Sequence, residues 1–251
     1  MIHKKEEMFY HLTVPDVHAL FTLPAVPIAF GSNAEVYTLD RSKVVRIQSH
    51  DDDEKEILDE IAITQRLTHI TPEVFLQAVD KKGGYLMVQK RMDASLHHHL
   101  CKNGAAHKDK TCSMIKTLLK KVALANVLWL DVKPGNMLLD YDDDGSVKEL
   151  KAIDFGDGLS EINPRGYAQR DYTIMLLLLN IHLEIHYKSV YNFNDDVAKL
   201  LSNRQNLMSV RNFFLSDEKD DTLHAVWQAY VLNYWPNMTR AQFWQNHLFQ
   251  G

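Results

Sequence analysis

Two apolar runs separated by an acidic turn constrain the fold of this chain more than any other feature. A hairpin can form from MLLDY and SVKELKAIDF, with the turn DDDG between the two strands. A polar loop, DVKPGN, comes directly before the hairpin, and the residues DFG end it. Because a hairpin returns the chain to its starting point, both loops are expected at one place in the molecule.

Four polar side chains would therefore meet at one site. The first loop presents Asp131, Lys133 and Asn136, and the second loop presents Asp154. Phosphoryl transfer needs a carboxylate to orient the attacking hydroxyl, a cation beside the moving group, and an amide and a carboxylate to bind Mg²⁺. We therefore predict that Asp131 and Lys133 are catalytic residues, and that Asn136 and Asp154 are metal ligands.

These motifs resemble the catalytic core of the protein-kinase superfamily. DVKPGN corresponds to the family pattern D-L-K-P-x-N, and the D-F-G motif of the family is intact. The resemblance implies an α+β, bilobal kinase-like fold with ATP and Mg²⁺ as cofactors. It places a small antiparallel sheet and one helix in residues 1–91, and a mainly helical lobe in residues 92–251.

The segment upstream resembles the phosphate-covering loop of the family. Its pattern is strand, glycine turn, strand, turn and strand. Gly31 is present, but Ala29 and Ala34 stand where the flanking glycines of G-x-G-x-x-G would be. We predict that Gly31 and Ser32 belong to the nucleotide site, where backbone N–H groups contact phosphates.

The strand KVVRIQ is expected to carry the phosphate-binding cation of the family. In an alignment with the V-A-I-K pattern that position is Arg46, while Lys43 falls earlier in the strand. Alternation along a strand places Val44 and Arg46 on one face, so Val36 and Val44 are predicted to cover the adenine. Arginine keeps the positive charge and can contact a phosphate and a carboxylate at once.

A predicted helix in HDDDEKEILDEIAITQRLTHI must supply the carboxylate that pairs with Arg46. Glu60 is predicted, because it lies with the apolar face of the helix. Glu56, one turn earlier on the same face, is the alternative.

Two further strands, VFLQAVD and GGYLMVQKRM, complete a predicted five-stranded antiparallel sheet. By analogy with the family, Val88 guards the pocket behind the adenine and Asp93 reaches the ribose. Gln89 and Arg91 are predicted to offer backbone groups to the nucleotide.

The catalytic segment departs from the family in ways that bear on regulation. Trp129 and Leu130 stand where His and Arg usually precede the catalytic Asp. In the family that Arg anchors a phosphorylated activation loop. The segment Asp157–Arg170 is also short, and its hydroxyls are Ser160 and Tyr167. We expect a protein that is active as synthesised or switched by a protein partner, and not by phosphorylation of this segment.

The second lobe is expected to be helical. RDYTIMLLLLNIHLEI is apolar nearly all round and predicts a buried central helix. Asp171 at its start resembles the Asp that braces the catalytic loop in the family. The consecutive histidines His97–His99 do not predict a metal site, because two ligands on one helix face need i, i+4 spacing.

Composition limits the classes of function. The net charge of −5 argues against general binding to nucleic acids or membrane surfaces. Cys101 and Cys112 are too few for a disulfide framework, so a reducing, cytoplasmic compartment is expected. The N-terminal residues MIHKKEEMFYHL contain no apolar core of a signal peptide, and TIMLLLLNIHL is too short to span a bilayer.

The predicted function is phosphorylation of Ser or Thr hydroxyls in a protein substrate. The short segment after DFG resembles the minimal kinases that bacterial pathogens inject into host cells, which implies a host protein as substrate and the host cytosol as location. One alternative is a small-molecule kinase of the aminoglycoside- or choline-kinase type, which Arg46 and the absence of a full activation segment favour and Lys133 opposes. Another is a pseudokinase that acts as a binding module, which the retention of Asp131, Asn136 and Asp154 opposes.

Overall fold

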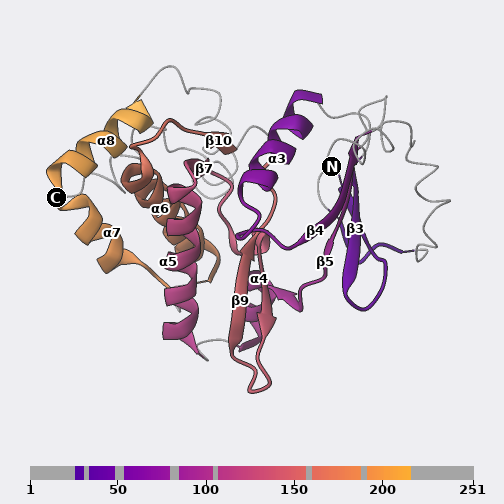
Figure 1. The fold of residues 1–251 in the computed structure, drawn as a ribbon. Coiled ribbons are helices and arrows are strands. Elements are labelled where there is room, and N and C mark those ends of the chain that lie inside the picture. The colour runs from indigo at the N-terminus through magenta and orange to yellow at the C-terminus, as the bar shows by residue number, and fades with distance from the viewer. Residues whose placement is uncertain are drawn as a thin grey trace.

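The structure of the protein is a computed structural model, and it consists of two groups of elements joined by a strand hairpin (Figure 1). Strands β3, β4 and β5 with helix α3 form one side of the view, and helices α5 to α8 form the other. The predicted α+β architecture, an antiparallel sheet with one helix beside a mainly helical part, is confirmed. The described residues are 26–30, 34–48, 54–79, 85–103, 107–156, 160–187 and 191–215.

The first group is a five-stranded antiparallel sheet with one helix, as predicted. The strands lie in the order β1-β2-β3-β5-β4, and helix α3 connects β3 to β4. The elements are β1 (Ala29–Phe30), β2 (Ala34–Thr38), β3 (Lys43–Gln48), α3 (Glu54–Arg66), β4 (Val74–Val79) and β5 (Tyr85–Lys90).

Alternation along β3 and β5 divides the sheet into two faces. Arg46 lies opposite Met87 in the antiparallel register, and Val45 lies opposite Val88. Because successive strand residues point to opposite faces, Arg46 and Met87 share one face, and Val45 and Val88 share the other. The second face is covered by a small apolar cluster, which comprises Tyr37, Val45, Ile47, Leu86 and Val88.

The second group is built on a buried central helix. Helix α6 (Ala168–Tyr187) is buried over most of its length, from Asp171 to Leu183, which confirms the prediction for this apolar run. Helices α5 and α8 contact it. The other helices are α4 (Leu96–Asn103), α5 (Lys108–Leu124), α7 (Asn194–Leu201) and α8 (Arg204–Leu215). None of the helices in the described ranges is long and apolar enough to cross a membrane.

The predicted hairpin lies between the two groups. β8 (Met137–Tyr141) pairs with β9 (Val147–Ala152) in antiparallel register. A short 3-10 turn, η1 (Pro134–Asn136), precedes β8, and the backbone N–H of Ile153 donates to the carbonyl of Asn136 at 3.0 Å. This bond joins the two ends of the hairpin, so the loops before and after it lie side by side.

Three short strands complete the surroundings of the hairpin. β6 (Ala94–Ser95) pairs with β8, and β7 (Val127–Trp129) pairs with β10 (Ser160–Ile162). The chain therefore passes from the first group to the second between β5 and β6, and the segment after DFG returns along the strand that leads into the catalytic loop.

Candidate active site

A cavity of about 230 Å³ lies between the sheet and the hairpin. Six predicted site residues line it: Val36, Arg46, Glu60, Gln89, Asn136 and Asp154. The sheet and α3 supply the first four of these, and the two ends of the hairpin supply Asn136 and Asp154. Of the four polar side chains predicted to converge, Asn136 and Asp154 therefore line the cavity, whereas Asp131 and Lys133 are not among its lining residues.

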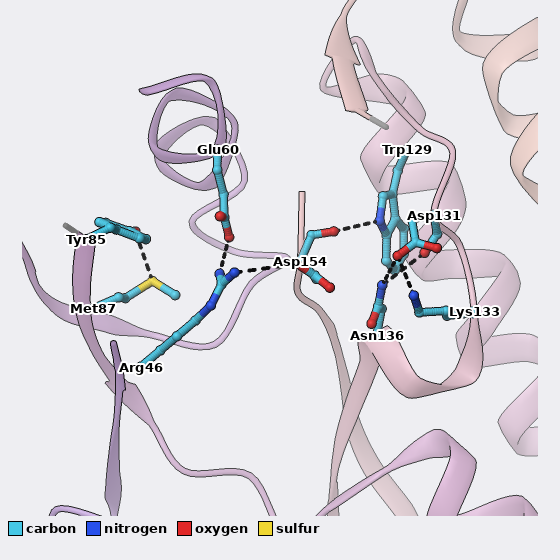
Figure 2. A network of polar contacts seen from close by, with 9 residues as sticks. All are labelled: Arg46, Glu60, Tyr85, Met87, Trp129, Asp131, Lys133, Asn136 and Asp154. Carbon is cyan, nitrogen blue, oxygen red and sulfur yellow. Dashed lines mark hydrogen bonds and ion pairs between the residues drawn. The ribbon is translucent and has the colours of Figure 1, made fainter. Parts of the chain in front are cut away.

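Arg46 joins the two sides of the cavity. One guanidinium nitrogen, Nη1, donates to Oε1 of Glu60, and Nη2 lies 3.6 Å from Oδ1 of Asp154 (Figure 2). The side chain of Glu60 is only 2% exposed and that of Arg46 is 15% exposed. Buried charges are tolerated when they are paired, and here each charge compensates the other.

The charge state of Arg46 follows from these contacts. Burial acts to lower the pKa of Arg46, but the carboxylates of Glu60 and Asp154 outweigh it and raise the pKa above its usual value. The guanidinium therefore stays positive in the cavity. Lys43 is not among the lining residues, and its ammonium group lies over the ring of Phe75, 5.1 Å from the centroid.

Gly156 allows Glu60 to approach the loop that contains Asp154. A Cβ atom at Gly156 would lie 3.2 Å from Oε2 of Glu60, which is tighter than an ordinary contact. A side chain at this position would require Oε2 of Glu60 to shift by a few tenths of an ångström. The sequence identified the motif, and the structure adds this contact between distant segments.

The catalytic loop holds three predicted residues in one hydrogen-bonded group. Nζ of Lys133 donates to Oδ2 of Asp131 at 2.6 Å, and Nδ2 of Asn136 donates to the same oxygen at 2.7 Å. Nδ2 of Asn136 also donates to the backbone carbonyl of Asp131 at 3.1 Å. These bonds position the carboxylate of Asp131 at the edge of the cavity that Asn136 lines.

Trp129 is a site residue whose role the sequence did not reveal. Its indole Nε1 donates to the backbone carbonyl of Asp154 at 3.2 Å, and its ring packs against Phe155 with centroids 5.3 Å apart. In Figure 2, Asp154 lies between Arg46 and Trp129. Trp129 thus supports the DFG segment from the side opposite to Arg46, in the place where the family pattern has His.

Asp154 has a backbone conformation that few residues adopt. Its φ of 65° is in the left-handed region, where Asp and Asn are enriched and which costs on the order of 1–3 kcal/mol. The contacts with Trp129 and Arg46 hold this conformation. It directs the Asp154 carboxylate, which is 37% exposed, toward the cavity.

Comparison with known families agrees with this geometry. A sequence profile described as "Protein kinase domain" matches residues 32–174, which is more than half of the chain. The chain belongs to the protein kinase domain family. No curated protein matches the sequence. Among solved structures, one described as "WaaP in complex with acyl carrier protein" is similar, with a TM-score of 0.45 and 12% identity, and the match covers 75% of this chain and 90% of that chain.

Kinase domains generally use ATP and Mg²⁺, and the residues of this cavity fit both. Mg²⁺ prefers oxygen ligands. Asp154 offers a carboxylate at the cavity wall, and Asn136 uses its amide nitrogen for its bonds to Asp131, so its amide oxygen is the atom suited to a metal. Arg46 provides the positive charge that phosphate groups need.

Not every predicted nucleotide contact lies where the family pattern suggests. Val88 does not guard the cavity of this kinase domain, because it belongs to the apolar cluster on the other face of the sheet. Met87 and Gln89 line the cavity in its place. Val44 is buried on the face of Arg46 but is not among the lining residues.

Two residues after β5 are held elsewhere by other contacts. The backbone N–H of Arg91 donates to the carbonyl of Ser42 at 2.8 Å, and Arg91 does not line the cavity. The carboxylate of Asp93 accepts the backbone N–H of Tyr141 at 2.9 Å, so it serves the β6–β8 junction. The predicted contacts of Arg91 with the nucleotide and of Asp93 with the ribose are therefore not supported.

Three predictions lie outside the described residues. Gly31 and Ser32 are not described, and neither is the side chain of Glu56. Their proposed roles stay predictions.

The segment after DFG is held by strand pairing and by a buried carboxylate. Asp171 accepts a hydrogen bond from Asn163 at 3.1 Å and pairs with Arg170 at 2.7 Å. The N–H of Asn163 donates to the carbonyl of Asn126, the residue before β7. Within the described residues, Asp171 is therefore linked through Asn163 to Asn126 and the strand that leads into the catalytic loop.

Proposed function

We propose that this kinase domain transfers the terminal phosphoryl group of ATP to Ser or Thr hydroxyls of a protein substrate. The observation that carries the proposal is the group formed by Asp131, Lys133 and Asn136. Lys133 lies two residues after the catalytic Asp, which resembles the serine/threonine-directed pattern of the family, and its ammonium group is 2.6 Å from the Asp131 carboxylate.

The roles of the chain's own residues follow from their positions. When bound, ATP supplies the phosphoryl group, and Mg²⁺ offsets the negative charge of its phosphates. Asp131 orients the acceptor hydroxyl and takes its proton, and Lys133 offsets charge on the moving group. Arg46, held by Glu60, would bind the phosphates from the sheet side, while Asn136 and Asp154 would hold the metal ion from the hairpin side.

The structure also offers an observation that favours a small-molecule acceptor. Between Gly156 and the start of α6 at Ala168, part of the chain is taken up by β10, which pairs with β7. Little chain is left to form a platform for a peptide. The small-molecule kinase is therefore the second candidate, and a host protein in the cytosol is the proposed substrate under the first.

A labelling experiment tests both candidates. The full chain is incubated with ATP carrying a radiolabelled terminal phosphate, with Mg²⁺ or with EDTA, and with a host-cell lysate split into protein and small-molecule fractions. Asp131→Asn, which is nearly isosteric, is the matched inactive control. We expect Mg²⁺-dependent label on Ser or Thr of the protein fraction.

The other outcomes decide against this proposal. Label confined to the small-molecule fraction would establish the second candidate instead. If neither fraction is labelled above the Asp131→Asn control, the chain acts as a binding module and not as an enzyme.

A further inference from the structure

Two acidic side chains face each other across the hairpin of β8 and β9. Asp140 of β8 and Glu149 of β9 are directly opposite in the antiparallel register, so both side chains lie on the same face of the hairpin. Like charges in directly opposite positions destabilise a strand pair. A cation placed between the two carboxylates would replace this repulsion with attraction.

Lys90, the last residue of β5, supplies that cation. Its Nζ donates to Oδ2 of Asp140 at 2.5 Å and to Oε2 of Glu149 at 3.3 Å. The side chain of Asp140 is only 16% exposed. A single exposed ion pair contributes little, but here one ammonium group bridges two carboxylates that would otherwise repel each other. We call Lys90, Asp140 and Glu149 the junction cluster.

The junction cluster lies where the sheet meets the hairpin. The backbone N–H of Asp93 donates to Oδ1 of Asp140 at 3.2 Å, so the same carboxylate also contacts the chain that leaves β5. Nζ of Lys151 lies 2.9 Å from Oε1 of Glu149 and donates to the carbonyl of His69 at 3.1 Å, in the segment that leads into β4. Because β4 and β5 are antiparallel, the start of β4 and the end of β5 are at the same end of the sheet. These contacts therefore attach that end of the sheet to both strands of the hairpin.

Each attachment is next to a wall of the nucleotide cavity. Gln89, which lines the cavity, directly precedes Lys90 in β5. On the hairpin side, Ala152 lines the cavity, and its backbone N–H donates to the carbonyl of Ile70 at 2.9 Å. Thr71, the next residue, also lines the cavity. A change in how the sheet is attached to the hairpin would therefore change the spacing between the two walls.

We propose that Lys90 is a positioning residue for the nucleotide: its bridge to Asp140 and Glu149 sets the spacing between the two cavity walls and thereby the affinity for ATP. Lys90 is not among the lining residues, so it acts through the placement of Gln89 and of the hairpin, without touching the nucleotide. This inference rests on the proposed use of ATP at this cavity, and it applies to a protein acceptor and to a small-molecule acceptor alike.

Removal of the ammonium group tests the bridge directly. Lys90→Met keeps an unbranched side chain and removes the charge. We expect it to raise the Kd for ATP in the presence of Mg²⁺, and the KM, by about fivefold, the scale of a partly exposed charged network. It should leave kcat nearly unchanged, because the substitution weakens binding without removing a group that acts in the transition state. Lys90→Arg keeps the charge and should restore the affinity.

The two facing carboxylates allow a second test with a distinctive sign. Glu149→Gln alone should have little effect on ATP binding. Combined with Lys90→Met, it should recover most of the lost affinity, because it removes the repulsion that Lys90 otherwise compensates. Two substitutions that only lowered the stability of the fold independently would instead have additive effects.

Binding of ATP by the full chain is measured by calorimetric titration with Mg²⁺, and transfer is measured separately by the labelling assay. Lys148→Met is the matched control, because it removes an exposed lysine of β9 outside the cluster; it should not alter binding. If Lys90→Met does not fold, Lys90→Gln replaces it.

The proposal is overturned if Lys90→Met binds ATP as tightly as the unchanged chain, if Lys90→Arg does not restore binding, or if Lys148→Met weakens binding equally. Binding of ATP without transfer to any acceptor would contradict the proposed transfer and leave the role of Lys90 supported by the binding data. Absence of ATP binding by the unchanged chain would overturn both.

Discussion

The two sides of the active site rest on apolar cores of different size. On the hairpin side, Trp129, Leu130 and Val132 are fully buried in the large core that also contains most of α6. On the sheet side, the face of Arg46 is bordered, among the described residues, by a cluster of Ile57, Tyr85 and Met87 with Ile61 and Val74 partly buried against it. The catalytic loop is thus fixed by extensive packing, whereas the position of Arg46 depends mainly on its ion pair with Glu60.

This difference predicts two kinds of failure. Substitutions on the hairpin side that leave the apolar core intact should abolish phosphoryl transfer without lowering the stability of the fold. Substitutions on the sheet side that break the ion pair should lower both transfer activity and stability, because they leave a buried charge without its partner. The following predictions test this distinction, from the largest expected effect to the smallest.

Loss of the Asp154 carboxylate should have the largest effect on activity. Asp154→Asn keeps a side chain that tolerates the left-handed backbone and removes the charge proposed to bind Mg²⁺. We expect phosphoryl transfer to fall to the background of the assay while the melting temperature changes little. Asp154→Ala should behave alike, with a small additional loss of stability. Asp142→Ala, which alters an exposed turn, is the control, and full activity of Asp154→Asn would refute the assignment.

Removal of Arg46 should reduce both activity and stability. Arg46→Ala is expected to lower the rate by about 10²–10³, the scale for one positioned electrostatic group. It should also lower the free energy of unfolding by about 3–5 kcal/mol, because Glu60 stays buried without its partner.

A double variant separates these two effects. Arg46→Met with Glu60→Gln should recover much of the melting temperature but none of the activity, as measured by thermal unfolding and by the transfer assay. A crippling effect of Lys43→Ala together with a mild effect of Arg46→Ala would show that the wrong residue of β3 has been assigned.

Trp129→Phe should have an effect of intermediate size on the transfer rate, and it tests whether Trp129 positions Asp154. It keeps an aromatic ring against Phe155 and removes the hydrogen bond to the Asp154 carbonyl. A bond of this kind contributes about 0.5–1.5 kcal/mol, so we expect a loss of several-fold in rate at low Mg²⁺. Excess Mg²⁺ should recover part of the loss, and Trp129→His, which restores a ring N–H, should recover more. A melting-temperature change without a change in Mg²⁺ dependence would indicate a purely structural role.

Ser160→Ala should have the smallest effect. Ser160 lies opposite Trp129 in the β7–β10 pair, and its hydroxyl oxygen is buried and has no hydrogen-bond partner within the described residues. A kinase acting on it would first have to open this pair. We expect equal transfer rates for untreated protein, phosphatase-treated protein and Ser160→Ala. A large drop in the last two would show that phosphorylation controls the site.

The position of α3 bears on the alternative of switching by a partner. The pair between Arg46 and Glu60 is formed, and Gly156 lies against Glu60 in the single chain. Arg66 at the end of α3 also donates to the carbonyl of Ala125 after α5. Helix α3 thus lies in the position that pairs Glu60 with Arg46, and our prediction of a protein that is active as synthesised or switched by a protein partner stays a prediction.

The sequence by itself determined the features that depend on local periodicity. Alternation placed Val44 and Arg46 on one face of β3, and the turn between β8 and β9 brought Asn136 and Asp154 together. Both follow from patterns within one strand or one hairpin. The structure has the same pairing of Arg46 with Glu60 that the apolar face of α3 predicted.

Only the tertiary structure decided which face meets which partner. Because adjacent residues of β5 point to opposite faces of the sheet, Met87 and Gln89 line the cavity, whereas Val88 lies on the other face. Trp129 supports Asp154, which is 25 residues away in the sequence. Residues that share a face can be read from spacing, but the segment that packs against that face is set by contacts between distant parts of the chain.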